Sequence, residues 1–164
     1  MNVEVREARR EDTPVLRRLM QLYLYDLGTI DGWDLGDDGL YGIEARIEGF
    51  WTDPNRRSFL VRVDGKLAGF ALVRDGAHFA GDGTREISEF LILRRYRRRG
   101  AGERVARRVF DMFPGRWEVT ELGSNVEAQA FWRRVIGRYT GGRFKDVPRP
   151  DGRGQMQRFD NSRR

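Results

Sequence analysis

A chain of 164 residues has room for one compact domain, and the absence of cysteine excludes disulfides, a thiol nucleophile and thiolate metal sites. Hydrophobic residues make up 39% and charged residues 34%, as in soluble globular proteins, and no apolar run is long enough to span a membrane. The net charge of +6 suits nucleic acid or a small anion with several phosphates. We expect a single cytoplasmic domain over residues 1–164, because the charged N-terminus lacks a signal-peptide core.

The N-terminal third predicts one strand followed by two helices. Val3 and Val5 alternate with charged residues, as in a strand. Thr13 resembles a helix cap followed by a first-turn proline, and an apolar stripe at helical spacing leads to Gly28, where we expect the first helix to end. Residues 41–51 place their apolar side chains on one side and predict the second helix.

Between these helices, residues 29–40 combine aspartates, glycines and Trp33. Two interpretations stay open. The segment is a solvated loop, or it is an acidic lip that binds a cationic substrate, with Trp33 and Tyr41 covering the apolar part of that substrate. The four aspartates are Asp31, Asp34, Asp37 and Asp38.

The middle of the chain predicts three strands. Alternating apolar residues on both sides of Asp64-Gly65 predict a β-hairpin over 59–73. Residues 76–83 are rich in glycine and predict a loop, in which we assign no function to His78. Residues 86–93 form a short apolar run with aromatic and β-branched members, which indicates a central strand buried on both faces.

After this strand the apolar period changes to three and four residues, which predicts an amphipathic helix over 101–113. Strand and helix are joined by Arg97-Arg98-Arg99-Gly100-Ala101-Gly102. A helix start offers unpaired N–H groups and a partial positive charge, glycine lets a phosphate approach them, and arginines attract an anion. This turn therefore predicts a pyrophosphate site.

The remaining chain predicts a strand over 117–122, a helix over 126–136 that Gly137 closes, and two strands within 139–159. The predicted order of elements is β-α-α-β-β-β-α-β-α-β-β. No internal repeat or second-domain boundary interrupts this order.

Arg97-x-x-Gly100-x-Gly102, between an apolar strand and an amphipathic helix, resembles the acetyl-coenzyme A signature of the GNAT superfamily of N-acetyltransferases. Ile92 and Tyr96-Arg97 stand where that family has Val-x-Pro-x-Tyr-Arg, with Arg94 in place of the proline. The resemblance is best over 57–137. It implies one α/β (α+β) domain, with a mixed, mostly antiparallel sheet of six or seven strands flanked by about four helices.

The resemblance implies acetyl-coenzyme A as the acetyl donor and no metal. It places pantetheine along the central strand, at the backbone of Phe90 and Ile92, and the pyrophosphate on residues 97–102. Asn125 begins the family's Asn-x-x-Ala, in which the amide contacts the cofactor. The alternative for Asn125 is a helix cap with no other function.

Two carboxylates on the central strand are candidates for the catalytic base. Glu86 falls where histone-type family members carry their base, whereas Glu89 lies nearer the expected thioester. On a regular strand they point to opposite faces, and a bulge of the kind typical of the family would change that alternation and favour Glu89. The alternative is that either glutamate only pairs with an arginine.

The usual proton donor to the leaving thiolate is missing. Trp132 stands where the family often has a tyrosine, and an indole cannot supply that proton. The thiolate therefore leaves unassisted, or takes a proton from water, Tyr139 or another group.

The leading prediction is an acetyl-coenzyme A-dependent N-acetyltransferase that acts on a primary amine of a small molecule or peptide, with a positively charged acceptor. It expects no nucleic acid and no membrane as partners, and it is compatible with a homodimer. The alternative is a non-catalytic protein: a coenzyme A sensor of the same fold, or a basic module that binds nucleic acid through residues 94–108.

Overall fold

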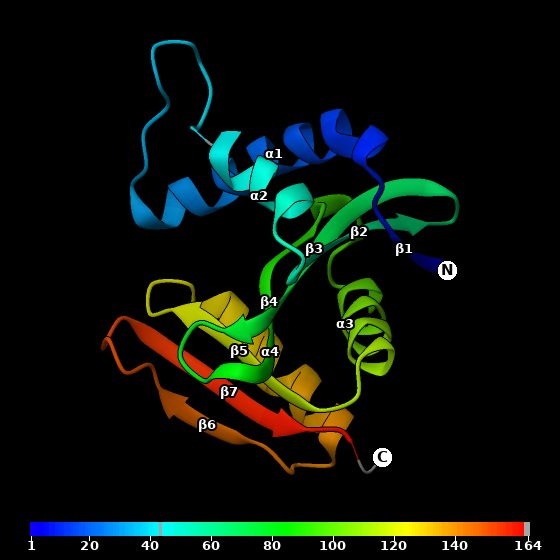
Figure 1. Cartoon of the computed structure of the whole chain (residues 1–164), viewed down its shortest axis with the longest axis vertical. Helices are drawn as coiled ribbons and strands as arrows, with labels where there is room; N and C mark the ends of the chain where they lie inside the picture. The colour runs from blue at the N-terminus through cyan, green and yellow to red at the C-terminus, as the bar shows by residue number, and fades with distance from the viewer. Residues whose placement is uncertain (43, 163–164) are drawn as a thin grey trace.

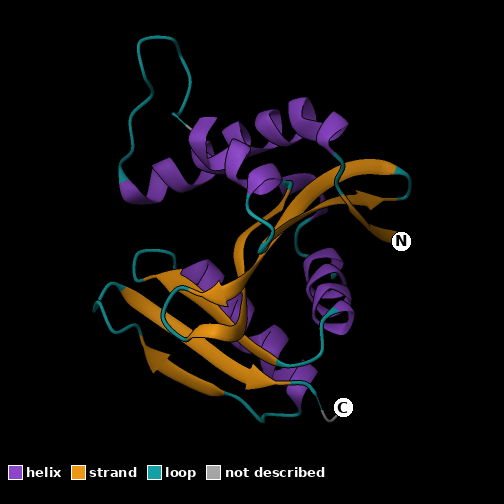
Figure 2. Cartoon of the chain, viewed as in Figure 1, coloured by secondary structure: helices purple, strands orange, loops and turns teal. Residues whose placement is uncertain are grey.

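The computed structural model describes residues 1–42 and 44–162, which fold into a seven-stranded sheet and four α-helices (Figures 1 and 2). The helices are α1 (Thr13–Asp31), α2 (Glu44–Thr52), α3 (Ala101–Met112) and α4 (Val126–Thr140). The strands are β1 (Val3–Glu7), β2 (Arg56–Val63), β3 (Lys66–Ala77), β4 (Gly81–Ile92), β5 (Arg116–Leu122), β6 (Lys145–Pro148) and β7 (Gly154–Asp160).

The strands lie in the order β1-β2-β3-β4-β5-β7-β6. Neighbouring strands are antiparallel except β4 and β5, which run parallel. The predicted fold class and the predicted order of elements are therefore confirmed.

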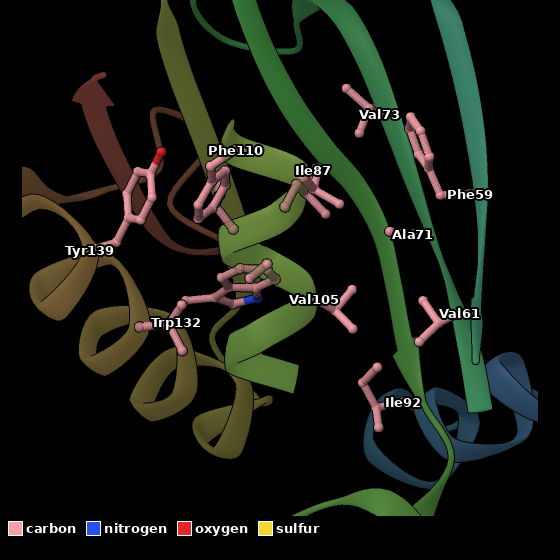
Figure 3. Close-up of a cluster of buried hydrophobic side chains, with 14 of the residues drawn as sticks. Phe59, Val61, Ala71, Val73, Ile87, Ile92, Val105, Phe110, Trp132 and Tyr139 are labelled. Atoms are coloured by element: carbon pink, nitrogen blue, oxygen red, sulfur yellow. The ribbon is translucent and has the colours of Figure 1, made fainter. Parts of the chain in front are cut away.

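Two hydrophobic cores lie on opposite faces of the sheet. On one face, α1 and α2 pack over a cluster that contains Phe70, Leu72 and Leu91. On the other face, α3 and α4 pack over a larger cluster, in which Phe110 lies beside Trp132 and Tyr139 (Figure 3). The rings of Trp117 and Phe159 also contact Phe110. The central strand β4 contributes to both clusters, through Leu91 to one and through Ile87 and Ile92 to the other, as predicted for a strand buried on both faces.

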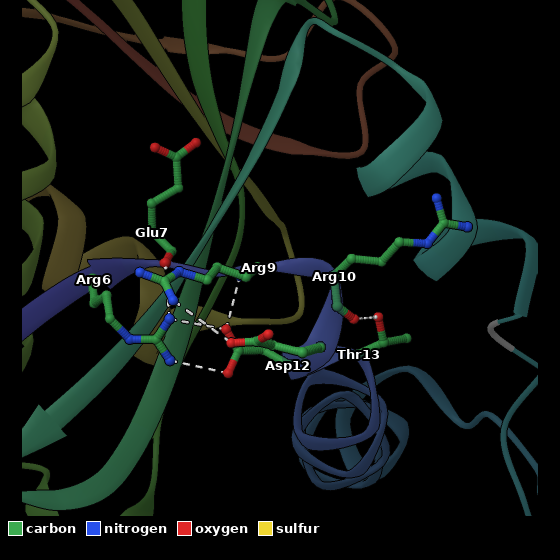
Figure 4. A network of polar contacts seen from close by, with 7 residues as sticks. Arg6, Glu7, Arg9, Arg10, Asp12 and Thr13 are labelled. Atoms are coloured by element: carbon green, nitrogen blue, oxygen red, sulfur yellow. Dashed lines mark hydrogen bonds and ion pairs between the residues drawn. The ribbon is translucent and has the colours of Figure 1, made fainter.

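A polar network fixes the start of α1 (Figure 4). Both carboxylate oxygens of Asp12 accept hydrogen bonds from the guanidinium of Arg6, at 2.9 and 3.0 Å, and one also accepts the Arg9 backbone N–H at 2.8 Å. These bonds lower the pKa of Asp12 below its ordinary value. The prediction that Thr13 caps the helix was wrong, because Asp12 is the cap residue and Thr13 is already helical.

Two predicted helix ends were also wrong. Helix α1 continues through Gly28 to Asp31, and Gly28 is buried where the Tyr41 hydroxyl packs closely over it. Helix α4 continues through Gly137 to Thr140, where Gly141 at φ 63° forms the cap. In both helices a glycine in the interior looked like a terminator in the sequence. The second predicted helix begins at Glu44 rather than Tyr41, and its Ile43 lies outside the described residues.

The predicted hairpin is confirmed, with Asp64 and Gly65 at φ 49° and 74°, the positive values that a tight two-residue turn requires. The prediction of a loop over 76–83 was wrong. Strand β3 runs on to Ala77 and β4 starts at Gly81, so only residues 78–80 form the turn between them.

Two absences hold for residues 1–42 and 44–162. None of their helices has the length and the apolar character needed to cross a bilayer. None of their His, Asp and Glu side chains gather in threes or more in a way that could hold a metal ion.

Candidate active site

The two halves of the sheet separate at β4 and β5. The parallel ladder joins four residue pairs, from Thr84–Arg116 to Ile87–Val119. Beyond it, residues 88–92 of β4 and 120–122 of β5 diverge, and the sheet opens between its two halves (Figure 1). The predicted pantetheine contacts, the backbone of Phe90 and Ile92, lie on this open part of β4.

The start of α3 lies next to this opening. Gly100 is the cap residue, with φ 80°, and glycine has no side chain that could hydrogen-bond to the helix end. The first N–H groups of a helix have no partner inside it, so those around Gly100, Ala101 and Gly102 offer donors to an anion. The geometry of this turn fits a pyrophosphate.

The two glycines of the turn serve different purposes. Gly100 has open space around its Cα, but its positive φ disfavours any other residue. A Cβ on Gly102 would lie 3.1 Å from the Phe131 ring of α4. Gly102 is therefore needed for close packing of α3 against α4, which the sequence did not reveal.

The three arginines of the turn also differ. The Arg97 guanidinium donates to the Ile92 carbonyl at 2.6 Å and pairs with Asp26 of α1, which Arg94 also contacts. Arg98 and Arg99 are exposed, with Arg98 3.7 Å from Glu127. Long-range attraction of an anion thus falls mainly to Arg98 and Arg99, while Arg97 holds the turn against α1.

Helix α1 bridges the open ends of β4 and β5. Asp26 contacts the turn after β4 through Arg94 and Arg97. Further along the helix, Asp31 accepts a hydrogen bond of 2.7 Å from the hydroxyl of Ser124, which follows β5. The C-terminal half of α1 therefore borders the opening on one side.

Asn125 acts as a helix cap. Its Oδ1 accepts the backbone N–H of Ala128 at 3.1 Å and so caps α4. A cofactor contact, which stays a prediction, would use the Nδ2 group or the remaining lone pair of Oδ1.

A β-bulge brings the two candidate bases to one face of β4. Glu86 lies opposite Arg74 of β3, and Glu89 lies opposite Leu72, so Ser88 is an extra residue between them. Because residues 72 and 74 point to the same face, so do Glu86 and Glu89. Both line one pocket of about 400 Å³. The pocket is lined by Phe50, Arg56, Arg74, His78, Phe79, Glu86, Ser88, Glu89, Thr120 and Arg149.

Glu86 is committed to structural contacts. Its Oε2 accepts the His78 backbone N–H at 2.7 Å, and its Oε1 lies 3.4 Å from Nε of Arg74. The fully buried Glu118 of β5 accepts the next N–H, that of Phe79, at 3.1 Å, and pairs with Arg158 at 2.9 Å. The two carboxylates therefore hold the β3–β4 turn over the pocket.

A second pocket, of about 720 Å³, adjoins the first through Arg149, which lines both. Asp31 and Trp33, two of the four predicted substrate residues, line it together. Asp34 is exposed on the loop beyond them. Tyr41 lies apart: its backbone is bonded twice to Gln21, at 2.9 Å, and its hydroxyl packs over Gly28.

Tyr139 does not replace the missing acid at Trp132. The Trp132 indole is buried, 5.0 Å from the Phe90 ring between centroids, so it belongs to the core. The Tyr139 hydroxyl donates to Asp111 at 2.8 Å and accepts from Asn161 at 3.0 Å, in the core under α3 and α4. This location removes Tyr139 from the candidate acids.

Several pocket residues escaped the sequence analysis, notably Phe79 and Arg149. The Arg149 guanidinium lies 5.3 Å from the centre of the Phe79 ring and is fixed by two hydrogen bonds to Asp151. They come from the β3–β4 turn and the β6–β7 connection, 70 residues apart in the chain. His78, the only histidine, lines the same pocket, although nothing in the sequence assigned it a function.

A buried carboxyl lies on β5 beside the opening. Glu121 accepts a hydrogen bond of 3.2 Å from the Gln157 amide, which also donates to Asp146 at 3.0 Å. Burial raises the pKa of Glu121 to about 8, because removal from water disfavours the charged form.

The sequence matches the profile of the acetyltransferase (GNAT) family over residues 16–137. The chain belongs to the GNAT family of acetyltransferases. A search of curated protein sequences gave no match.

Solved structures share the fold along nearly the whole chain. An acetyltransferase from Thermus thermophilus is 20% identical with a TM-score of 0.74, covering 98% of this chain and 97% of that one. An aminoglycoside acetyltransferase in complex with coenzyme A is 16% identical with a TM-score of 0.66, covering 97% and 95%. The ribosomal-protein-S18-alanine N-acetyltransferase from Escherichia coli is 14% identical with a TM-score of 0.62, covering 99% and 96%.

Proposed function

We propose that the protein transfers the acetyl group of acetyl-coenzyme A to a primary amine of a small molecule or peptide. The observation that carries this proposal lies at the open ends of β4 and β5. The start of α3, which has no side-chain cap, adjoins that opening, and a pocket with Glu86 and Glu89 lies along β4. Two of the similar solved structures add support: the aminoglycoside acetyltransferase in complex with coenzyme A and the ribosomal-protein-S18-alanine N-acetyltransferase.

The chain's own residues supply binding and proton transfer. Acetyl-coenzyme A, when bound, supplies an activated acetyl thioester. The N–H groups at residues 100–102 bind its pyrophosphate, with Arg98 and Arg99 attracting it. Glu89 accepts the proton that the amine loses as the C–N bond forms and the C–S bond breaks. The departing thiolate takes a proton from water, since the indole N–H of Trp132 is too weak an acid to supply one.

We assign the base to Glu89 rather than Glu86. Glu89 is half-buried and lines the pocket, whereas Glu86 is only 7% exposed and supports the β3–β4 turn through His78. A carboxylate that must exchange protons needs access to the amine, and the deeper burial of Glu86 restricts that access.

The acceptor in this proposal carries a positive charge. Asp31 and Trp33 line the larger pocket together with Arg149 and Arg153, so the negative charge beside it comes mainly from Asp34 and its neighbours on the adjoining loop. In this proposal the loop aspartates attract a cationic amine and the indole covers it.

Two measurements on the same protein test the function. Calorimetry should show binding of coenzyme A, and mass spectrometry should detect acetyl transfer to members of a panel of polyamines, aminoglycosides, amino acids and peptides. Binding without transfer to any of them would favour the alternative of a coenzyme A sensor, which the core position of Trp132 supports. No binding of coenzyme A at all would refute both.

A further inference from the structure

The outer side of α1 and the loop after it expose an unusual number of large apolar side chains. Six of the nine exposed large hydrophobic residues among residues 1–42 and 44–162 fall within residues 22–40. We call them the α1 surface: Leu22, Tyr25, Ile30, Trp33, Leu35 and Leu40, which are 41% to 60% exposed. Clustered exposed apolar side chains mark interaction sites, whereas single ones need no explanation.

The loop part of this surface is held by its own hydrogen bonds. The Gly36 N–H donates to the Leu40 carbonyl at 2.9 Å, and the Gly39 N–H donates to Gly36 at 2.8 Å. The Asp38 carboxylate accepts the Leu40 N–H at 3.0 Å. The loop projects away from the rest of the molecule (Figure 1) and presents Leu35 and Leu40 to solvent.

The same segment has a charge opposite to that of the whole chain. Residues 19–45 contain neither lysine nor arginine, although the chain has 31 of these residues and a net charge of +6. Asp31 is bonded to Ser124, but Asp34, Asp37 and Asp38 surround the apolar side chains on the exposed loop. The loop part of the α1 surface is therefore apolar with a negative border, whereas on the helix the exposed Arg18 lies one turn before Leu22.

We propose that the α1 surface docks a basic, apolar segment of a polypeptide. Charge complementarity selects lysine and arginine in that segment, and the six apolar side chains select leucine-like neighbours. This inference rests on the proposed function and narrows it. The surface continues through Trp33 into the larger pocket, so a docked polypeptide brings its amine to the acceptor side of the opening.

A second copy of this chain fits the surface poorly. A two-fold symmetric dimer through this face would bring two copies of the same acidic loop into one interface. That accumulation of like charge opposes association, so the occupant is a different, basic molecule.

Fluorescence anisotropy with labelled synthetic peptides tests the proposal on the full chain. The probe is a 12-residue peptide of alternating lysine and leucine pairs, and the matched peptides replace its lysines by glutamate or its leucines by serine. We expect binding of the lysine–leucine peptide only, at least about tenfold tighter than either control, and weaker binding at higher salt.

Two pairs of variants locate that binding. We expect two double variants to weaken peptide binding about tenfold or more. Leu22→Ser with Tyr25→Ser removes apolar contacts of the size that a small interface core supplies. Asp34→Asn with Asp37→Asn removes electrostatic steering of the peptide. The matched controls are Met112→Ser with Val126→Ser, both exposed elsewhere, and Glu11→Gln with Asp82→Asn. These controls should bind the peptide like the wild type.

Equal affinity in all four variants, or equal binding of the three peptides, overturns the proposal. So does a sedimentation result in which the wild type is a dimer and the Leu22→Ser, Tyr25→Ser variant a monomer. Calorimetry with coenzyme A on the same proteins keeps the two proposals apart. If the wild type binds coenzyme A but binds all three peptides equally, the docking surface alone is refuted. If the wild type does not bind coenzyme A, the proposed function is refuted.

Discussion

The Glu86 carboxylate accepts the backbone N–H of His78 at a distance of 2.7 Å. This bond joins the middle of β4 to the turn that precedes the strand, and Glu118 makes the equivalent bond to Phe79 from the neighbouring strand β5. A buried carboxylate with such partners stabilises a turn, because an unpaired N–H and an unpaired charge would both be costly. Glu86 is thus better explained as a support of the pocket than as its base.

Substitution of Glu89 should therefore affect turnover, whereas substitution of Glu86 should affect stability. Glu89→Gln should lower turnover about 100-fold or more, the usual size of a general-base contribution, with little change in coenzyme A affinity. Glu86→Ala should instead lower the free energy of unfolding by about 1–3 kcal/mol, because it leaves the His78 N–H without its acceptor and removes the carboxylate beside Arg74. Acetyl-transfer kinetics and urea unfolding of both variants measure these effects. If turnover falls less than about tenfold in Glu89→Gln and more in Glu86→Gln, the assignment of the base is reversed.

The exposed arginines of the turn should control affinity for the cofactor. Arg98→Glu with Arg99→Glu should weaken coenzyme A binding about tenfold or more in calorimetry, because two charges beside the helix start are reversed. The matched control is Arg9→Glu with Arg10→Glu, an adjacent exposed pair before α1, which makes the same change in net charge. An equal loss of coenzyme A affinity in both double variants would show that only net charge matters. The turn at 97–102 would then no longer be assigned as the pyrophosphate site.

The two glycines of the turn should respond differently to alanine. Gly100→Ala should cost about 1–2 kcal/mol from its positive φ alone. Gly102→Ala should cost about 1–3 kcal/mol through overpacking against Phe131, and Phe131→Leu should relieve part of that cost. A double-mutant cycle in urea unfolding measures the coupling, for which Gly100→Ala with Phe131→Leu is the control. If the changes in the free energy of unfolding for Gly102→Ala and Phe131→Leu are additive, the two residues do not contact each other as described.

Local signals allowed much of the fold to be predicted. Asp64-Gly65 between alternating strands specified the hairpin, and the change of apolar period at Ala101 specified the step from β4 to α3. Glycines inside helices were wrongly predicted to be helix ends, because tertiary packing determines whether the helix continues there. Gly28 looked like a helix end, but Tyr41 packs over it and α1 continues.

The site was predictable only where it is local in sequence. The turn at 97–102 combines glycine, charge and a helix start within six residues, and it lies beside the opening of the sheet. The pocket combines Glu89 with Phe79 and Arg149, which lie far apart in the sequence. The buried Glu118 of β5 holds the turn that carries Phe79, and the nearby Asp151 holds the Arg149 guanidinium. The pattern of residues within one segment cannot predict contacts between segments that lie far apart in the sequence.

Stability should depend on pH through Glu121. This carboxyl loses its proton near its ordinary value of 4.5 in the unfolded chain and at about 8 in the folded protein, mainly because it is buried. Between these values the folded state binds more protons than the unfolded state. The free energy of unfolding should therefore fall as pH rises from about 5 to 8, by at most about 1.4 kcal/mol per pH unit. Above pH 8 the contribution of Glu121 becomes constant.

Glu121→Gln should remove this pH dependence. The glutamine amide keeps an oxygen that can accept the Gln157 hydrogen bond and carries no charge at any pH, so the variant should be more stable than the wild type at pH 9. At pH 5 the two should be nearly equal, since the wild-type carboxyl is then protonated. Urea unfolding at one-unit steps from pH 5 to 9 measures the difference, with the exposed Glu4→Gln as the control. A constant difference between wild type and Glu121→Gln across this range would show that Glu121 ionises alike in the folded and unfolded states.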